Sequence, residues 1–287
     1  MQQQLIAVVG AGQMGSGIAQ VFAQAGYQVI LNDLNDVALE RARNTISTSL
    51  SRLAQKNSEI KPDAVLARIR YSTAWSALAD ADLAIEAASE RLDIKLELMH
   101  TLSDHVRADA IIASNTSSIS LTVLAAQVQH PERVIGLHFM NPVPLMALVE
   151  VIRARQSSDA THQAALDWVT RLGKTAVSVN DAPGFVSNRV LMPMINEAVF
   201  TLYEGVADAN AIDTVMRLGM NHPIGPLALA DLIGLDTCVA IMDVLYTEFR
   251  DSKYRVCPLL TQMVAAGQLG RKSRQGFYDY PQSKGTR

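Results

Sequence analysis

The chain has 287 residues, of which 49% are hydrophobic and 18% are charged. This balance excludes a disordered chain, and the length suits about two globular domains. The 25 basic and 28 acidic residues give a net charge of −3, which leaves no global basic field to bind nucleic acid or an anionic membrane. The two cysteines, Cys238 and Cys257, are far apart, which excludes a disulfide framework and favours a reducing, cytoplasmic location.

The sequence also argues against a secreted or membrane-spanning protein. The amino-terminal segment MQQQLIAVVGAG has no basic residue and runs directly into a strand-like stretch, unlike a signal peptide. Two long stretches, residues 110–131 and 134–149, contain no Asp, Glu, Lys or Arg. The first is rich in Ser, Thr, Asn and Gln, and the second is interrupted by Pro142 and Pro144, so neither is suited to cross a bilayer.

From residue 5 to about 180, short apolar runs alternate with helical patterns such as Ile18–Ala25 and Lys95–Val106. Near-continuously apolar strands between amphipathic helices predict a doubly wound α/β domain whose sheet is buried on both faces. The expected strands are Leu5–Val9, Gln28–Asn32, Leu83–Ala87, Ile111–Ser114, Val134–His138, Leu148–Ile152 and Ala176–Val179.

A long helix is expected after the second strand, because apolar residues recur at helical spacing from Leu39 to Leu53. Pro62 marks a break before a second, short helical piece that ends near Ile69. Together these segments predict an antiparallel helical pair inserted into the α/β domain.

The pattern changes after Asp181, where the segment NDAPGFVSNR carries turn signals and helical periodicity then dominates. Gly205, Gly219 and Gly267 stand where helices would end in a left-handed cap. We therefore expect an α/β domain over residues 1–183 and an all-α domain over residues 184–287. The expected helices are Leu191–Leu202, Ile212–Leu218, Asp236–Phe249 and Leu259–Ala266.

The segment LIAVVGAGQMGSGIAQ contains Gly10-x-Gly12-x-x-Gly15 between a strand and a helix that opens at about Met14. In this setting the glycines permit a tight turn, close approach of a pyrophosphate, and packing of helix on strand. Unpaired N–H groups at the helix start favour a phosphate, and Gln13 lies beside them. Asp33 follows at the end of the next strand, where a carboxylate binds the adenine ribose and repels a 2′-phosphate, so NAD is favoured over NADP.

Polar residues at the ends of apolar strands are candidates for a site, because ligands of open α/β sheets bind outside the carboxyl ends of the strands. Ser117 lies in IIASNTSSIS, where a hydroxyl could bind a substrate oxygen or only cap a turn. His138 ends one strand and Glu150 lies in the next, so a strand–turn–strand return can bring them together. Such a pair suits a general base, although a satisfied core histidine and an ordinary ion pair are equally compatible with the sequence.

Two further segments carry polar residues that have both a functional and a structural interpretation. Asn188 and Arg189 open an apolar helix at the domain junction, where ligand clefts are common. Ser49, Arg52 and Lys56 lie on one face of the long helix, which suits either a phosphate-binding patch or a solvated face. The six histidines are scattered and no calcium loop occurs, so we expect no metal.

Six segments taken together resemble the L-3-hydroxyacyl-CoA dehydrogenase family over essentially the whole chain, in order and at matching spacing, and most closely its single-copy bacterial 3-hydroxybutyryl-CoA members. The resemblance implies a Rossmann domain with an inserted helical hairpin, followed by a helical dimerisation domain. It also implies NAD-dependent interconversion of (3S)-3-hydroxyacyl-CoA and 3-oxoacyl-CoA by a homodimer, with short acyl chains such as 3-hydroxybutyryl-CoA and acetoacetyl-CoA as the expected substrates. The segments are GAGQMGSGIAQ, SNTSSIS, GLHFMNPVPLMALVEV, DAPGFVSNR, NHPIGPLALADLIGLDT and GRKSRQGFYDY.

The same resemblance implies roles for single residues. His138 matches the family's catalytic base and Glu150 its partner acid, while Ser117 and Asn188 match residues that hold the substrate's 3-oxygen. The matching cofactor contacts are Gly10, Gly12, Gln13, Met14, Gly15, Asp33, Glu90, Lys95, Ser117 and Lys272, and the matching coenzyme A contacts are Ser49 and Lys56.

The chain departs from the family pattern at two positions, since Arg274 stands where glycine is usual and Ala147 where lysine is common.

Two rival interpretations accompany the resemblance. A β-hydroxyacid dehydrogenase or imine reductase pairs similar domains but typically carries a catalytic lysine or aspartate at the helical junction, where this chain has Asn188. A non-catalytic, crystallin-like dinucleotide-binding protein is disfavoured because Ser117, His138, Glu150 and Asn188 are all retained.

Overall fold

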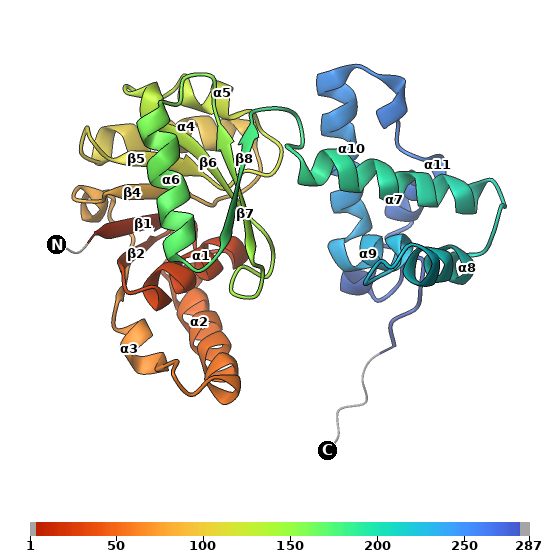
Figure 1. The fold of residues 1–287 in the computed structure, drawn as a ribbon, viewed down its shortest axis with the longest axis horizontal. Coiled ribbons are helices and arrows are strands. Elements are labelled where there is room, and N and C mark those ends of the chain that lie inside the picture. The colour runs from red at the N-terminus through yellow and green to blue at the C-terminus, as the bar shows by residue number, and fades with distance from the viewer. Residues whose placement is uncertain (1–3, 282–287) are drawn as a thin grey trace. The chain divides into compact units, whose positions relative to one another are not determined.

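The computed structural model describes residues 4–281 and divides the chain into two compact units, Met1–Ala182 and Pro183–Arg287 (Figure 1). The first unit is built on a sheet, and the second is built from helices. Each unit has a hydrophobic core of its own. The boundary expected from the sequence, between residues 183 and 184, lies one residue from this division.

The first unit is an eight-stranded sheet in the order β3-β2-β1-β4-β5-β6-β7-β8. All neighbouring strands are parallel except β6 and β7, which are antiparallel. The central strands are wholly apolar or nearly so, as a sheet covered on both faces requires. The strands are β1 Leu5–Val9, β2 Gln28–Asn32, β3 Ile69–Ser72, β4 Leu83–Glu86, β5 Ile111–Ser114, β6 Val134–Phe139, β7 Leu148–Arg153 and β8 Thr175–Asn180.

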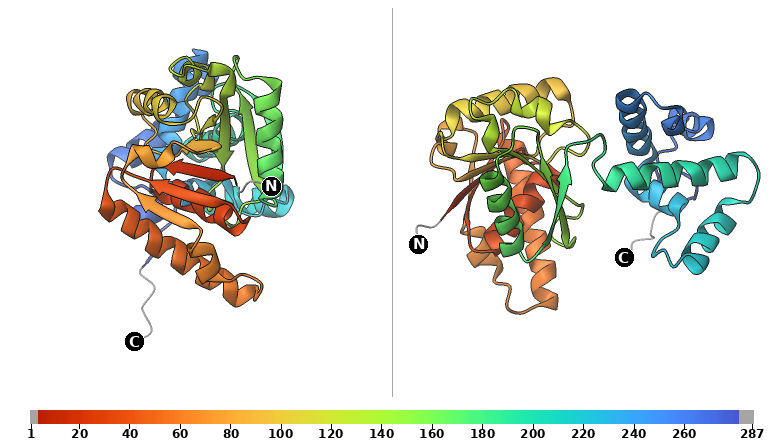
Figure 2. Two further views of the ribbon diagram at one scale, coloured as in Figure 1. Left: turned by 90° about the vertical axis from the view of Figure 1, so that its left-hand side faces the viewer. Right: turned by 45° about the horizontal axis from the view of Figure 1, so that its top comes forward.

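Helices cover both faces of this sheet, with α4 and α6 on opposite sides of it (Figure 2). Their sequences carry the expected amphipathic pattern, and the buried positions of α6 include Ala165, Trp168 and Val169. The helices of the first unit are α1 Gln13–Gln24, α2 Asp36–Lys56, α3 Pro62–Leu66, α4 Leu92–His105, α5 Leu121–Ala125 and α6 Asp159–Arg171.

The region after α2 differs from the sequence-based expectation. The short helix α3 ends at Leu66, and Ile69 begins strand β3 rather than ending a helix. β3 was missed because it is a short edge strand, IRYS, with one buried side chain, so it lacks the apolar signature of the inner strands. The helical pair is therefore a long α2 followed by a helix of a little more than one turn, and the two are in contact.

The second unit packs its helices around a core that includes Ile195, Leu227 and Leu245. Gly205 and Gly267 follow helix ends with positive φ, as expected for left-handed caps. The same expectation for Gly219 is wrong, because this residue ends a π-helical turn, Val215–Gly219, without a positive φ. The helices are α7 Ser187–Tyr203, α8 Ala209–Thr214, α9 Pro226–Ile233, α10 Leu235–Phe249 and α11 Pro258–Ala265.

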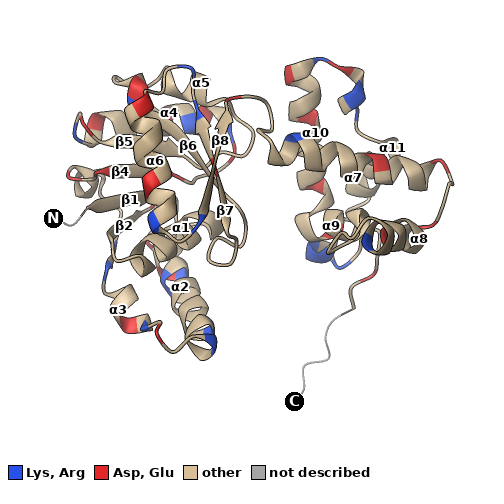
Figure 3. Ribbon diagram, viewed as in Figure 1, with Lys and Arg blue, Asp and Glu red and all other residues tan. Residues whose placement is uncertain are grey.

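Charged residues of both signs are interspersed over both units (Figure 3). Within residues 4–281, no helix is both long enough and apolar enough to cross a membrane. The same part of the chain holds no cluster of three or more His, Cys, Asp or Glu side chains arranged to bind a metal ion.

Candidate active site

The antiparallel pairing of β6 with β7 sets His138 directly opposite Glu150. The His138 Nδ1 atom lies 2.7 Å from Glu150 Oε2, and the two residues are only 8% and 2% exposed. An ionised carboxylate can only accept a hydrogen bond, so Nδ1 carries the proton and the neutral ring has its lone pair on Nε2. This arrangement gives the ring a fixed orientation and a defined atom that can take up a proton.

The loop between β1 and α1 is closed by glycines. Gly10 has a φ of +105°, a conformation that glycine adopts readily. A Cβ at Gly15 would lie 1.7 Å from the Gly10 carbonyl oxygen, so only glycine permits the helix to start this close to the strand. At Gly12, in contrast, a Cβ would meet no atom within 4 Å. The turn is therefore tight on its inner side and open at Gly12, where a bound phosphate needs space.

A cavity of about 940 Å³ lies along this loop and is lined by Gln13, Met14 and Asp33 among others. Asp33 accepts hydrogen bonds from the backbone N–H of Ala11 at 2.7 Å and of Asn35 at 3.1 Å, which holds its carboxylate at the end of β2. A carboxylate has about four acceptor positions, so it can still bind ribose hydroxyls. The size of the cavity, the open glycine and the held carboxylate together fit a dinucleotide.

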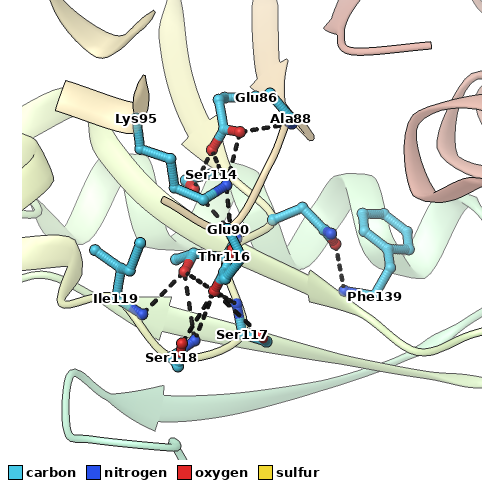
Figure 4. Close-up of polar contacts among 11 residues, drawn as sticks. Glu86, Ala88, Glu90, Lys95, Ser114, Thr116, Ser117, Ser118, Ile119 and Phe139 are labelled. Carbon is cyan, nitrogen blue, oxygen red and sulfur yellow. Dashed lines mark hydrogen bonds and ion pairs between the residues drawn. The ribbon is translucent and has the colours of Figure 1, made fainter. Parts of the chain in front are cut away.

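Ser117 lies in a loop after β5 whose shape is set by Glu90 (Figure 4). One Glu90 oxygen, Oε1, accepts from the Ser117 N–H at 2.8 Å and from the Ser117 hydroxyl at 3.1 Å. The same oxygen accepts from the Thr116 hydroxyl at 2.6 Å and from the Ser118 N–H at 3.0 Å. Partial desolvation opposes the charge on Glu90, but Lys95 and these donors outweigh it and lower the pKa of its carboxyl.

Lys95 is 1% exposed and lies beside Glu90, in contact with two carboxylates (Figure 4). Its Nζ atom is 2.7 and 2.8 Å from the two oxygens of Glu86 and 3.3 Å from Glu90 Oε2. Glu86 is fully buried and also accepts from the Ser114 hydroxyl and the Ala88 N–H, each at 2.6 Å. The buried network formed by Glu86, Lys95 and Ser114 thus holds Glu90 through Lys95. Direct contact of Lys95 with a cofactor stays a prediction.

The Ser117 loop is also tied to the strand that carries the histidine. Asn115, two residues before Ser117, accepts a hydrogen bond through Oδ1 from the Phe139 N–H at 3.0 Å. Phe139 directly follows His138 in β6. The ends of β5 and β6, neighbours in the sheet, are therefore fixed relative to each other, and with them the Ser117 loop and the histidine.

A second cavity, of about 620 Å³, lies between α2 and the loop that joins β6 to β7. Ser49, Arg52 and Lys56 line it from α2, and Pro142, Pro144 and Leu145 line it from the loop. The side chains that the sequence placed on one helix face thus border a concave surface rather than an open one.

The remaining predicted residues belong to the second unit. Asn188 lies in the first turn of α7 and is 8% exposed. Lys272 forms an ion pair with Asp236, in the first turn of α10. Arg274 has a φ of +64°, in the left-handed region where glycine is most readily accommodated. The departure from the family's glycine therefore leaves the backbone in a glycine-like conformation.

Sequence reasoning missed Glu86 and Ser114, which connect the Ser117 loop to the sheet. A signal for Glu86 was present, because it is the one charged residue in the otherwise apolar strand β4. The same kind of signal, a carboxylate in an apolar strand, singled out Glu150. Ser114 gave no such signal, since small hydroxyl residues are common at strand ends and turns.

Comparison with known proteins connects this geometry to a family. Residues 5–182 match the NAD binding domain of 3-hydroxyacyl-CoA dehydrogenase, and residues 184–280 match the C-terminal domain of the same family. NAD is thus the dinucleotide that suits the glycine loop and Asp33.

Individual relatives cover nearly the full length. A probable 3-hydroxybutyryl-CoA dehydrogenase of Deinococcus radiodurans is 54% identical, over 95% of this chain and 99% of its own. The 3-hydroxybutyryl-CoA dehydrogenase of Bradyrhizobium diazoefficiens is 51% identical, over 97% and 96%. The crystal structure of (S)-3-hydroxybutyryl-CoA dehydrogenase from Ralstonia eutropha is 50% identical, with a TM-score of 0.95 over 98% of this chain and 100% of that one. The chain therefore belongs to the 3-hydroxyacyl-CoA dehydrogenase family.

Proposed function

We propose that this protein interconverts (3S)-3-hydroxyacyl-CoA and 3-oxoacyl-CoA with NAD, and that its preferred substrates are the four-carbon pair 3-hydroxybutyryl-CoA and acetoacetyl-CoA. The observation that carries the proposal is the His138–Glu150 hydrogen bond of 2.7 Å, in the same unit as the dinucleotide loop. The preference for a four-carbon acyl chain is inferred from the names of the relatives at 51 and 54% identity, which are 3-hydroxybutyryl-CoA dehydrogenases.

Within this mechanism, His138 acts as the general base for the oxidation and as the general acid for the reduction. Its Nε2 atom takes the proton of the substrate's 3-hydroxyl, because Nδ1 is engaged with Glu150. Glu150 stabilises the imidazolium that then forms. The nicotinamide, when bound, supplies hydride chemistry at the substrate's C3 carbon.

We assign Ser117 the binding of the substrate's 3-oxygen, and Glu90 the positioning of Ser117. The Ser117 hydroxyl donates to Glu90 Oε1 at 3.1 Å, and this hydrogen bond holds the side chain in place. The family resemblance supports a role for Asn188 at the same oxygen. This role is tested by Asn188→Ala, for which we expect a lower kcat.

The residues proposed to bind NAD are Gly10, Gly12, Gln13, Met14, Gly15 and Asp33 in the first unit, with Glu90, Lys95, Ser117 and Lys272 as further contacts. Asp33 disfavours NADP, because its charge would face the 2′-phosphate. Losing a charge-assisted hydrogen bond at this position should weaken NADH binding by about 10- to 150-fold in Asp33→Ala.

Ser49 and Lys56 are proposed to bind the nucleotide part of coenzyme A, which is supported by their place in the second cavity. A homodimer and a cytoplasmic location are further proposals. The location is supported by the free state of Cys238 and Cys257, and the dimer is tested by light scattering on the purified protein.

The experiment that tests the function is oxidation of NADH by the purified protein with acetoacetyl-CoA, followed by absorbance. We expect turnover that is faster with acetoacetyl-CoA than with longer 3-oxoacyl-CoA substrates, and faster with NADH than with NADPH. NADH binding without turnover of any 3-oxoacyl-CoA would support the non-catalytic alternative. A preference for NADPH would contradict the role given to Asp33.

A further inference from the structure

Lys174, a residue that neither the dyad nor the cofactor loop uses, binds the loop that walls the second cavity. It directly precedes β8, and its Nζ atom donates to the carbonyl oxygens of Val143 at 2.7 Å and Met146 at 2.5 Å. Both carbonyls belong to the β6–β7 loop, residues 140–147. An ammonium that donates to two carbonyls three residues apart fixes the curvature of the segment between them.

The environment of Lys174 shows that this contact is specific rather than a surface ion pair. No carboxylate lies within ion-pair distance of Lys174 in the part of the chain that is described. The charge is half-buried, and desolvation lowers the pKa of the amine. Burying a lysine without an acidic partner is unfavourable unless its donors are used, and the loop carbonyls use them.

The β6–β7 loop is also held by α1 and by the dinucleotide loop. Val143 is 2% exposed and packs on Gly17 of α1, where an added Cβ would lie 2.8 Å from the Val143 Cβ. Gln13, in the dinucleotide loop, donates through Nε2 to Asn141 Oδ1 at 3.0 Å. With these contacts on its inner side, the loop turns Pro142, Pro144 and Leu145 toward the second cavity.

Leu145 is 68% exposed and forms part of the cavity wall opposite Arg52 and Lys56. A wall with an exposed apolar residue facing basic residues suits a ligand that is apolar along one side and anionic along the other. Resting on the proposed function, we infer that Lys174 is a positioning residue for acyl-CoA. It holds the β6–β7 loop in the shape that binds the nucleotide part of the substrate, and it takes no part in proton or hydride transfer.

The test compares Lys174→Met with Lys174→Arg and with Arg171→Met, which removes a charge from an exposed position three residues earlier, at the end of α6. In Lys174→Met we expect the Kd for free coenzyme A, by calorimetry, and the KM for acetoacetyl-CoA to rise by about 5- to 20-fold, which is less than the loss of a charge-assisted hydrogen bond made directly to the ligand because Lys174 acts through the loop. kcat and the KM for NADH should stay near wild type. Lys174→Arg should recover most of the loss, and Arg171→Met should show none.

Amide hydrogen exchange gives a readout that does not depend on activity. In wild type the N–H groups of Leu145 and Met146 donate to the Pro142 carbonyl at 3.0 and 3.1 Å, so they should be protected. Lys174→Met should raise exchange in residues 141–147, while the β-strands keep their protection.

The outcomes separate this inference from the function on which it rests. If wild type binds coenzyme A and reduces acetoacetyl-CoA but Lys174→Met behaves like Arg171→Met, the role of Lys174 is wrong and the function stands. If wild type neither binds coenzyme A nor turns over acyl-CoA, both are overturned. A fall in kcat without a change in coenzyme A affinity would move Lys174 from substrate binding to the reaction itself and contradict the inference.

Discussion

Two buried pairs in the first unit have the same closest distance, 2.7 Å, yet differ in chemistry. Lys95 and Glu86 are 1% and 0% exposed, and they pair an ammonium with a carboxylate. His138 and Glu150 are 8% and 2% exposed, and an imidazole can exchange a proton near neutral pH. An ammonium–carboxylate pair with several further donors maintains a shape, whereas a pair containing a histidine can also carry out a reaction. The following predictions test that distinction.

The largest effect is expected on catalysis at the histidine pair. His138→Gln should lower kcat by about 10²–10⁴-fold, because the general base is lost, while NADH binding and the melting temperature change little. Glu150→Gln should also lower kcat strongly, since the imidazolium loses its counter-charge. The double variant should lose little more than His138→Gln alone, because the two side chains act as one unit.

His100→Gln is the control, since His100 is exposed and lies on α4. Steady-state kinetics of the four variants and wild type test this prediction. If the losses multiply in the double variant, or if His138→Gln keeps nearly the wild-type kcat, the pair is structural and the base lies elsewhere.

The next largest effect is on stability, at the lysine pair. Lys95→Met leaves Glu86 charged and buried without its main partner, which should lower the free energy of unfolding by roughly 3–5 kcal/mol. Glu86→Gln combined with Lys95→Met removes both charges and should recover most of that loss. Urea unfolding of the single and double variants measures the difference. A double variant as unstable as Lys95→Met would show that shape, not charge pairing, sets the stability here.

A third effect depends on pH and concerns Glu90, which connects the lysine pair to Ser117. Its pKa is lowered below the ordinary 4.5, so its stabilising contribution is fully present above that value and is lost as the pH falls through the lowered pKa. The difference in unfolding free energy between wild type and Glu90→Gln should therefore be constant at neutral pH and shrink below about pH 4.5. Urea unfolding of both proteins across this pH range tests the prediction. A difference that grows on acidification would contradict a lowered pKa for Glu90.

The smallest effect is expected at Ser114, whose hydroxyl donates to Glu86 at 2.6 Å. Ser114→Ala removes one donor from a buried carboxylate that keeps Lys95 and Ala88, so it should cost about 1–2 kcal/mol of stability. The accompanying change in kcat should be far smaller than that of His138→Gln. A fall in kcat as large as in His138→Gln would contradict the view that the Lys95–Glu86 pair only maintains the shape of the site.

The sheet and the histidine pair could be predicted because both depend on local patterns. The apolar runs define the inner strands without reference to the rest of the chain, and His138 and Glu150 are separated by a single strand return of 12 residues. Antiparallel pairing then places them opposite each other. The edge strand β3 lacked this signal, because only one of its four side chains is buried.

The burial of Lys95 and the role of Lys174 could not be predicted in the same way. Lysine is normally exposed, and a helical pattern does not reveal that one lysine of α4 turns inward to Glu86. The two acceptors of Lys174 lie 31 and 28 residues away, in a loop whose shape depends on α1 and β8. Such contacts result from the packing of segments that are distant in the sequence, and no periodic pattern of residues indicates them.

The reversal between β6 and β7 also has a consequence for how this protein tolerates changes in chain length. Residues added to the exposed part of the β6–β7 loop would lengthen the return without altering which strand residues face each other, so His138 and Glu150 would keep their pairing. One residue added inside β7 before Glu150 would instead turn the carboxylate to the opposite face of the sheet, because side chains alternate along a strand. An insertion in the loop should therefore affect mainly acyl-CoA binding, whereas an insertion a few positions later, in β7, should abolish the reaction.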